Sequence, residues 1–219
     1  QLVNGQFVVT AEIAPPKGTD IREPLAAVEK MTGITAVNVT DNQGANMRLS
    51  SLALAARLQQ QGTETVLQLT CRDRNRMALQ SDLLGAASFG IENLLLLSGD
   101  HSKFGDHPDS RPVFDLDSVQ LLDMAAGLMA GTDMAGTSLD GVPEFFPGAA
   151  VNSAGYPFDL LFHNVEKNSD SGARFFQTQS VFDRETLERF MVAMRPLQVP
   201  VIAGVLLIRS ARMARFLND

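Results

Sequence analysis

The chain has 219 residues, 45% of them hydrophobic and 20% charged, with a formal net charge of −7. This composition excludes an intrinsically disordered chain, and the excess of acidic residues argues against binding nucleic acid through a positive surface. A single cysteine excludes an internal disulfide, and no hydrophobic run approaches the ~20 residues of a membrane helix. No signal peptide is recognisable, so we expect a cytoplasmic globular protein that binds neither nucleic acid nor membrane.

Short β-rich runs alternate with longer segments of helical periodicity along the chain. Strands are expected at residues 7–14, 36–40, 65–70, 94–97, 145–152, 175–179 and 199–206. Helices are expected from residue 19 or 20, over 48–61, 73–88, 118–129 and 158–170, and from residues 183 and 210. Two irregular segments, 101–117 and 131–144, interrupt this pattern, and the first is long enough to be an exposed functional loop or lid.

This alternation predicts about seven βα units with right-handed crossovers. Most strands are nearly continuous hydrophobic runs, which favours a parallel sheet covered on both faces. An eightfold barrel usually takes ~250 residues, so one further unit would complete it. A doubly wound open sheet is the competing arrangement, but no strand is followed by a Gly-x-Gly-x-x-Gly turn. We therefore predict an α/β protein: one (β/α)8 TIM barrel over residues 1–219, with its last βα unit missing at the C-terminal end.

In such a barrel, polar residues at the C-terminal ends of the strands face the active site. Glu12 is the most informative of them, because a carboxylate interrupts an otherwise hydrophobic strand. Burial raises the pKa of a carboxyl, which would make Glu12 a candidate general acid. A salt-bridged residue at the barrel mouth is the structural alternative. The other polar strand-end residues are Thr40, Gln68, Thr70, Asp100, Asn152, Gln177 and Gln179.

Three further groups of residues have a structural and a functional interpretation. Acidic and histidine residues gather at 100–109, but metal ligands must converge, so a solvated loop or a contact with a cofactor's adenine is favoured and no metal site is predicted. Cys71 has no suggested base nearby and is expected to be a packed thiol. Arg72, Arg74 and Arg76 fit either a solvated helix face or a contact with a diphosphate or a partner.

Four motifs follow one another at consistent spacing. They are Ala-Glu-Ile-Ala-Pro-Pro at 11–16, Leu-Thr-Cys-Arg-Asp-Arg-Asn at 69–75, Leu-Ser-Gly-Asp at 97–100 and Gly-Ala-Arg-Phe-Phe-Gln-Thr-Gln at 172–179. In order and spacing they resemble the methylenetetrahydrofolate reductase family. The resemblance runs from Glu12 to residues 210–213, which is nearly the whole chain.

The resemblance implies an eightfold barrel that carries FAD or FMN, with NAD(P)H as the reductant and folate as the substrate. The implied reaction is reduction of 5,10-methylenetetrahydrofolate to 5-methyltetrahydrofolate, a step of one-carbon metabolism and methionine biosynthesis. Glu12 would be the general acid that protonates the departing nitrogen of the folate ring. Folate contacts are implied for Glu12, Asp100 and Gln179. Cofactor contacts are implied for Thr40, Asp41, Ala45, Gln68, Ser98, Gly99, Asp100, Asn152, Asn164, Lys167 and Asn168.

The chain departs from the family pattern at several cofactor positions. Gln68 stands where some members have His, Ser98 replaces an Arg, Asn168 aligns with a phosphate-binding Lys, and Ala211 lies near the position of an aromatic residue. The loop at 107–117 resembles that of members from acetogen-type pathways, which act with a partner subunit. Two alternatives follow: a flavin-independent NAD(P)H-dependent reductase, or a non-catalytic folate-binding or docking subunit. A homo-oligomer or a partner reductase subunit is expected.

Overall fold

The computed structural model describes residues 1–154, 158–208 and 210–218. Its strands are β1 (Thr10–Ile13), β2 (Ala36–Val39), β3 (Thr65–Thr70), β4 (Asn93–Leu97), β5 (Phe146–Val151), β6 (Phe175–Ser180) and β7 (Val201–Gly204). Its α-helices are α1 (Arg22–Glu29), α2 (Ser51–Gln60), α3 (Arg76–Ser88), α4 (Ser118–Met129), α5 (Phe158–Asp170), α6 (Arg184–Met194) and α7 (Ala211–Asn218). Short 3-10 turns are η1 (Leu2–Asn4), η2 (Gln43–Ala45), η3 (Ser102–Phe104) and η4 (Arg195–Leu197).

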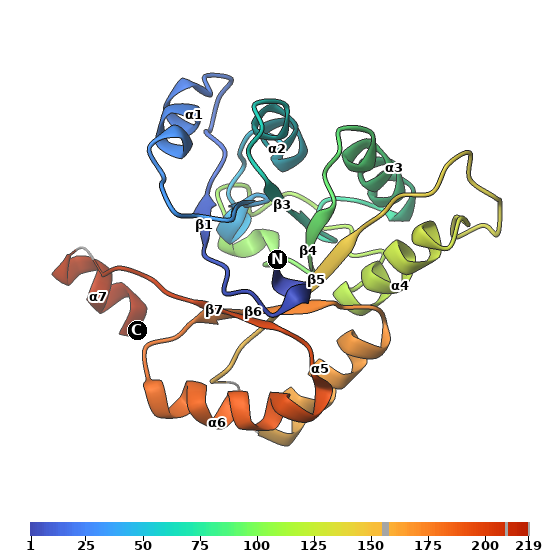
Figure 1. Ribbon diagram of the computed structural model, residues 1–219. Helices are drawn as coiled ribbons and strands as arrows, with labels where there is room; N and C mark the ends of the chain where they lie inside the picture. The colour runs from blue at the N-terminus through green and yellow to red at the C-terminus, as the bar shows by residue number, and fades with distance from the viewer. Residues whose placement is uncertain (155–157, 209, 219) are drawn as a thin grey trace.

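The strands form one parallel sheet in sequential order from β1 to β7, and the sheet curls with the helices around its outside (Figure 1). The predicted succession of seven parallel βα units is therefore confirmed. A doubly wound sheet would reverse its strand order at a switch point, so the sequential order excludes that alternative. Within the described residues β1 and β7 are the two edges of the sheet, which leaves one side of the curl open.

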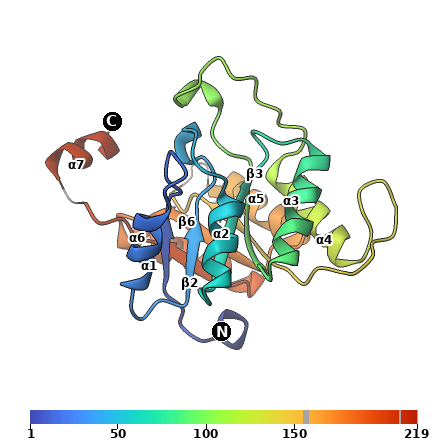
Figure 2. The same ribbon diagram turned by 90° about the horizontal axis from the view of Figure 1, so that it is seen from above.

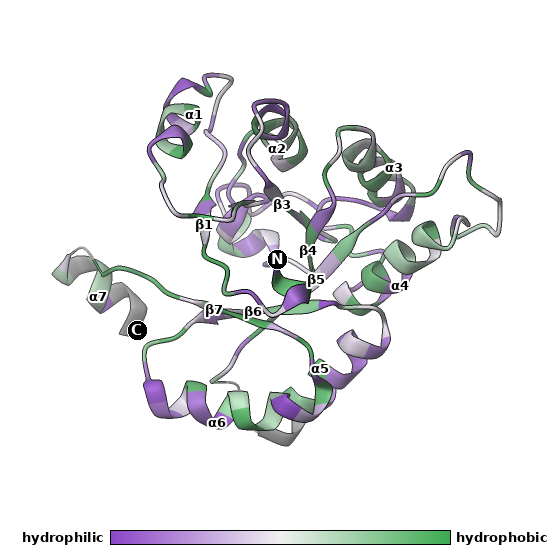
Figure 3. Cartoon of the chain, in the orientation of Figure 1, coloured by the Kyte–Doolittle hydropathy of each residue, from purple (hydrophilic) through white to green (hydrophobic). Residues whose placement is uncertain are grey.

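Hydrophobic residues pack on both faces of the sheet. The larger cluster joins the outer face of the strands to the helices, whose hydrophobic and hydrophilic residues lie on different faces (Figure 3). A smaller cluster lies inside the curl and contains Ala36, Val66, Leu95 and Phe175, with Leu2 of η1 packed against it. The ring of Phe175 stacks on a second ring of this inner layer, Phe146, at a centroid distance of 5.5 Å. These side chains fill one end of the interior.

Helix starts are set by capping side chains. Ser50, Asn75, Asp117 and Asp183 each accept a hydrogen bond from a backbone N–H in the first turn of α2, α3, α4 and α6, respectively. The predicted helix over 73–88 consequently begins three residues later, at Arg76. Strand β1 likewise begins at Thr10 and not at residue 7. None of the described helices is long and hydrophobic enough to cross a bilayer.

Candidate functional site

A cavity of about 1300 Å³ occupies the inside of the curled sheet, and every strand from β1 to β7 contributes to its wall. Parallel strands end on the same side of a barrel, so their C-terminal residues converge around this space. The polar side chains in the lining come largely from those strand ends. They include Glu12, Asn38, Asp41, Gln68, Thr70, Asp100, Gln177 and Gln179.

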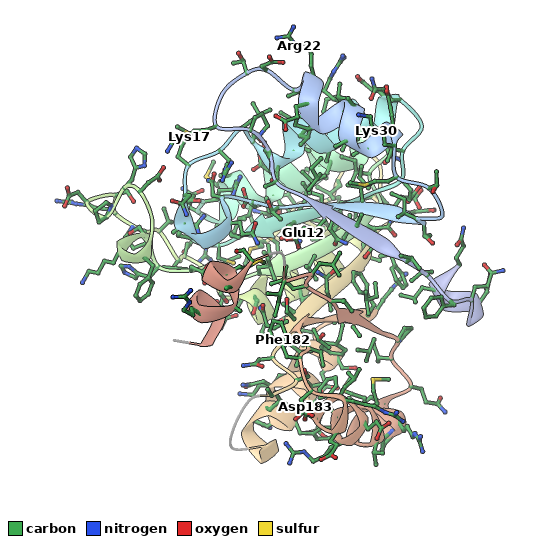
Figure 4. The ribbon with its side chains drawn as sticks, turned by 90° about the vertical axis from the view of Figure 1, so that its left-hand side faces the viewer. Glu12, Lys17, Arg22, Lys30, Phe182 and Asp183 are labelled. Carbon is green, nitrogen blue, oxygen red and sulfur yellow. The ribbon has the colours of Figure 1, made fainter. Side chains whose placement is uncertain are left out.

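Glu12 lines the cavity from β1, and its carboxylate is bracketed by two amides. Gln68 Nε2 lies 3.4 Å from Glu12 Oε2, and Gln43 Nε2 lies 3.3 Å from Oε1. The side chain is exposed, which corrects the expectation of a buried carboxyl. The reason is the position of β1 at an edge of the sheet: Figure 4 looks at this open side, with Glu12 in the middle of the view.

The turn that follows β4 brings residues 98–100 to the cavity wall. Gly99 has a φ of +87°, and a Cβ there would lie 3.0 Å from Cβ of Thr70, so this close approach requires glycine. Ser98 Oγ accepts a hydrogen bond of 3.2 Å from the backbone N–H of Ser118 at the start of α4. Asp100 is exposed, and its carbonyl oxygen accepts a hydrogen bond of 3.1 Å from Arg72. The Asp100 carboxylate is thus presented beside the cavity by a fixed backbone.

Asp41 also borders the cavity, but its carboxylate is engaged by its own chain. Oδ2 accepts hydrogen bonds from the backbone N–H of Thr70 at 2.9 Å and from its hydroxyl at 2.8 Å. Arg74 adds an ion pair at 2.7 Å, and both charged side chains are largely buried. The structure therefore gives Asp41 a role in joining β2 to β3, and contact with a cofactor stays a prediction.

The three arginines after β3 are all paired with acidic residues. Arg72 contacts Asp73 at 2.8 Å, Arg74 contacts both Asp41 and Asp82, and Arg76 contacts Asp115 at 2.9 Å. This arrangement holds the loops together and differs from the solvated helix face of the structural interpretation. Cys71 is fully buried beside them, and burial raises the pKa of its thiol to about 12, in keeping with a packed, unreactive side chain.

The long segment after β4 folds back onto the loops that follow β1 and β2. Asp106 binds Lys17 and accepts a hydrogen bond of 2.9 Å from the backbone N–H of Met47. Gly105 packs so closely that a Cβ there would overlap the carbonyl of Ala45. Within the described residues, no three His, Cys, Asp or Glu side chains come together as a metal site. The contacts of Asp106 and Gly105 show that the segment predicted to be a loop or lid is docked on the loops after β1 and β2.

The remaining predicted cofactor contacts are not among the described residues that line the cavity; they are Thr40, Ala45, Asn152, Asn164, Lys167 and Asn168. Thr40 is buried at the end of β2, and Ala45 is buried in η2 with a φ of +58°. Asn152 Oδ1 accepts a hydrogen bond from Ala154, and Asn168 Nδ2 donates one to the carbonyl of Asn164 on α5. The structure does not bring these α5 residues into the wall formed by the strands.

Two side chains of the inner wall were not assigned a role from the sequence. Asn38 is 2% exposed, and its Oδ1 is buried with no hydrogen-bond partner among the described residues. Gln177 Oε1 is buried and unpartnered in the same way. Gln177 was visible as a polar strand-end residue, whereas Asn38 lies within a hydrophobic strand. The signal for Asn38 is its place between the hydrophobic residues Val37 and Val39, which puts its side chain on the opposite face of β2 from theirs.

Comparison with known proteins gives a consistent result. The model of the family described as methylenetetrahydrofolate reductase matches residues 1–219. A probable methylenetetrahydrofolate reductase (NADPH) of Caenorhabditis elegans is 26% identical over 92% of this chain and 30% of its own length. A 5,10-methylenetetrahydrofolate reductase of Pectobacterium carotovorum is 26% identical over 93% of this chain and 65% of its own length. The chain thus spans about a third to two thirds of the length of these relatives.

A solved structure supports the fold independently. An uncharacterised protein from Clostridium thermocellum, described as binding two copies of 5-methyl-5,6,7,8-tetrahydrofolic acid, superposes with a TM-score of 0.63. The match covers 92% of this chain and 67% of that protein, with 12% sequence identity. At this identity the similarity concerns the fold alone.

Proposed function

Because the chain belongs to the methylenetetrahydrofolate reductase family, we propose that it reduces 5,10-methylenetetrahydrofolate to 5-methyltetrahydrofolate. The observation that carries this proposal is the cavity at the strand ends, where the Glu12 carboxylate lies among amide side chains. A single acidic group beside neutral hydrogen-bonding groups suits a reaction that needs one proton and the recognition of a polar heterocycle. The reductase acts as a (β/α)8-type barrel with residues 1–219 as one domain.

The residues around the cavity fit the ring system of a bound flavin. Oδ1 of Asn38 and Oε1 of Gln177 are buried acceptors that no described residue pairs with, and a flavin ring offers an N–H group between two carbonyls. Gln68, Asp41 and the 98–100 turn would adjoin the ring, while Thr40, Ala45, Asn152, Asn164, Lys167 and Asn168 would have to serve more remote parts. When bound, such a cofactor supplies hydride chemistry that no amino acid side chain provides.

Glu12 supplies the proton in the proposed reaction. Its carboxyl group transfers a proton to the departing nitrogen of the five-membered folate ring, which opens the ring and leaves a carbon able to accept hydride. Gln43 and Gln68 donate to the two carboxylate oxygens, so they orient the group toward the cavity. Asp100 and Gln179 bind the substrate in this proposal, because a carboxylate and an amide can pair with the amino-pyrimidinone edge of the pterin.

A flavin-independent reductase is the second candidate, because few cationic side chains line the described cavity. Among the described lining residues Arg72 is the one Lys or Arg, and it already binds Asp73 and two backbone carbonyls. A diphosphate therefore finds little charge at the cavity wall. We expect FMN or loosely held FAD, with direct reduction by NAD(P)H as the alternative. The cytoplasmic location and the homo-oligomer or partner reductase subunit remain predictions.

Replacing Glu12 tests the proposal directly. Glu12→Gln should lower folate reduction by about 10²- to 10⁴-fold, the loss typical of a positioned acid, while leaving reduction of any bound flavin by NAD(P)H unchanged. The assay follows 5-methyltetrahydrofolate formation and, separately, bleaching of the flavin absorbance. Glu29→Gln, an exposed carboxyl on α1, is the matched control and should behave as the original chain.

Two outcomes would contradict this assignment. Normal folate turnover by Glu12→Gln would show that Glu12 is not the general acid. Absence of folate reduction by the original chain with every flavin and nicotinamide would favour the folate-binding or docking subunit. A visible spectrum after incubation with FAD and FMN separates the two reductase candidates, because a colourless protein that still reduces folate with NAD(P)H is flavin-independent.

A further inference from the structure

We propose that Asn38 and Gln177 form an inner recognition pair that holds the N–H edge of a pyrimidinone ring inside the curled sheet. The inference rests on the proposed function and deepens it by assigning these two residues to ring recognition, for a pterin as well as for a flavin. Asn38 comes from β2 and Gln177 from β6, and both line the same cavity. They lie in the wall formed by the strands, whereas Asp100 projects from a turn.

The alternation of side chains along the strands places both amides inside. Ala36 and Phe175 belong to the hydrophobic cluster within the curl. Residues two positions apart on a strand share a face, so Asn38 and Gln177 point to the same interior. Leu2 and Leu95 of this cluster line the cavity together with the two amides. A ligand that enters between the strand ends therefore meets these amides on the inner wall.

Their unpaired acceptors indicate what such a ligand must offer. Asn38 Oδ1 and Gln177 Oε1 are buried with no partner in the described chain, and both side chains line the cavity. Burying an acceptor without a donor costs the free energy of removing it from water, and no hydrogen bond offsets this cost. Such atoms are therefore rare in folded proteins. Two of them on the wall of one cavity point to a ligand that donates hydrogen bonds.

The amide group also restricts the class of ligand. An Asn or Gln side chain presents one acceptor and one donor in a plane, so it pairs with an edge that has N–H next to a carbonyl or ring nitrogen. A pyrimidinone ring has this edge, and it occurs both in the pterin of a folate and in the ring of a flavin. A carboxylate-rich or phosphate-rich ligand would instead require cations on the inner wall, and Arg72 is committed to its own loops.

The test measures how tightly the purified chain binds each ligand that contains a pyrimidinone ring, which are a folate and two flavins. Asn38→Leu and Gln177→Met remove the amides with little change of volume. Asn93→Leu is the matched control, because Asn93 is an amide on β4 whose Nδ2 already binds Glu64 and the carbonyl of Thr65. Dissociation constants are measured by titration calorimetry with 5-methyltetrahydrofolate alone, with FMN alone and with FAD alone, and thermal unfolding is recorded without ligand.

In each inner-wall variant, we expect the dissociation constant of at least one of the three ligands to rise by about 10- to 100-fold. This is the effect of losing a buried hydrogen bond to a ligand. Loss confined to the folate arm identifies the pterin as the ring held, and loss confined to the flavin arms identifies the flavin. Because the removed acceptors are unpaired, the unfolding temperature without ligand should stay unchanged or rise. Asn93→Leu should lower the unfolding temperature and leave all dissociation constants unchanged.

The contrary results are distinct from failure of the proposed function. If the original chain binds folate or flavin and both inner-wall variants bind equally well, the recognition pair is wrong and the reductase proposal stands. If the variants unfold at lower temperature with unaltered dissociation constants, the amides are structural. If the original chain binds none of the three ligands, the reductase proposal and the recognition pair both fall.

Discussion

At the scale of single residues, the polar side chains at the strand ends divide into two groups. Asp41, Arg72 and Arg74 are engaged by neighbouring loops, so they hold the rim of the curl together. Asn38 and Gln177 have buried oxygens that the described chain leaves unpaired. The first group stabilises the fold, and the second group is available to a ligand. Residue type alone does not separate them, since each group consists of side chains with strong hydrogen-bonding capacity.

The ion pair between Arg74 and Asp41 should contribute strongly to stability. Their side chains are 16% and 2% exposed, and Arg74 also binds Asp82. Burial alone lowers the pKa of the Arg74 guanidinium, but the two carboxylates outweigh it and raise that pKa. Arg74→Met should therefore lower the free energy of unfolding by about 3–5 kcal/mol, because it leaves Asp41 as a buried, uncompensated charge. Urea unfolding at neutral pH measures the change.

A surface pair provides the comparison for this variant. Arg22 and Asp20 are 89% and 58% exposed, so Arg22→Met should leave the urea midpoint unchanged. Equal midpoints for Arg74→Met and the original chain would show that the buried pair adds no net stability.

At the scale of elements, the segment between β4 and α4 is held by acidic side chains at both ends. Asp106 binds Lys17, His107 and the backbone of Met47, and Asp115 binds Arg76. Hydrogen bonds from Lys17 lower the pKa of Asp106, and those from Arg76 lower the pKa of Asp115 to about 2. Figure 2 shows how far this segment reaches beyond the sheet and helices, so its attachment depends on such contacts.

The loop should therefore detach in acid. A carboxyl whose pKa is lowered by folding contributes stability above its unfolded pKa of ~3.9, and this contribution disappears as the pH falls toward the folded value. Asp115→Asn should reproduce the acid effect at pH 7, with faster amide hydrogen exchange in residues 105–114 and unchanged exchange in β3 and β4. Asp20→Asn removes an exposed pair elsewhere and serves as the control. Identical exchange of this loop in Asp115→Asn and the original chain would exclude the ion pair as an anchor.

At the scale of the whole molecule, the sheet is protected at its centre and accessible at its edges. Every residue of β3 is buried, whereas β1 and β7 contain exposed positions and each pairs with one neighbour in the described sheet. Hydrogen exchange should therefore be slowest in β3 and β4 and fastest among the strands in β1 and β7. The measurement is native-state exchange followed by mass spectrometry. Equal protection of β7 and β4 in a monomeric sample would refute this gradient.

Much of the architecture could be predicted from sequence because it depends on local patterns. Hydrophobic runs of strand length and intervening helical periodicity specify the seven parallel units, and the order of the motifs specifies the family. Glu12, Gln68, Asp100 and Gln179 were identified as strand-end residues for the same reason, and all four line the cavity. Parallel strands bring their ends together regardless of the details of packing.

The tertiary structure decided the environment of each side chain. Glu12 is exposed and not buried because β1 is an edge of the described sheet, a property of strand neighbours that lies outside its own hydrophobic segment. Asp41 is occupied by Arg74 from the loop after β3, so a candidate ligand contact became a structural ion pair. Asn38 lies in the interior with its oxygen unpaired, because no donor from the described part of the chain reaches it. Sequence determines which groups reach the site, whereas distances between separate segments determine which groups are free to bind.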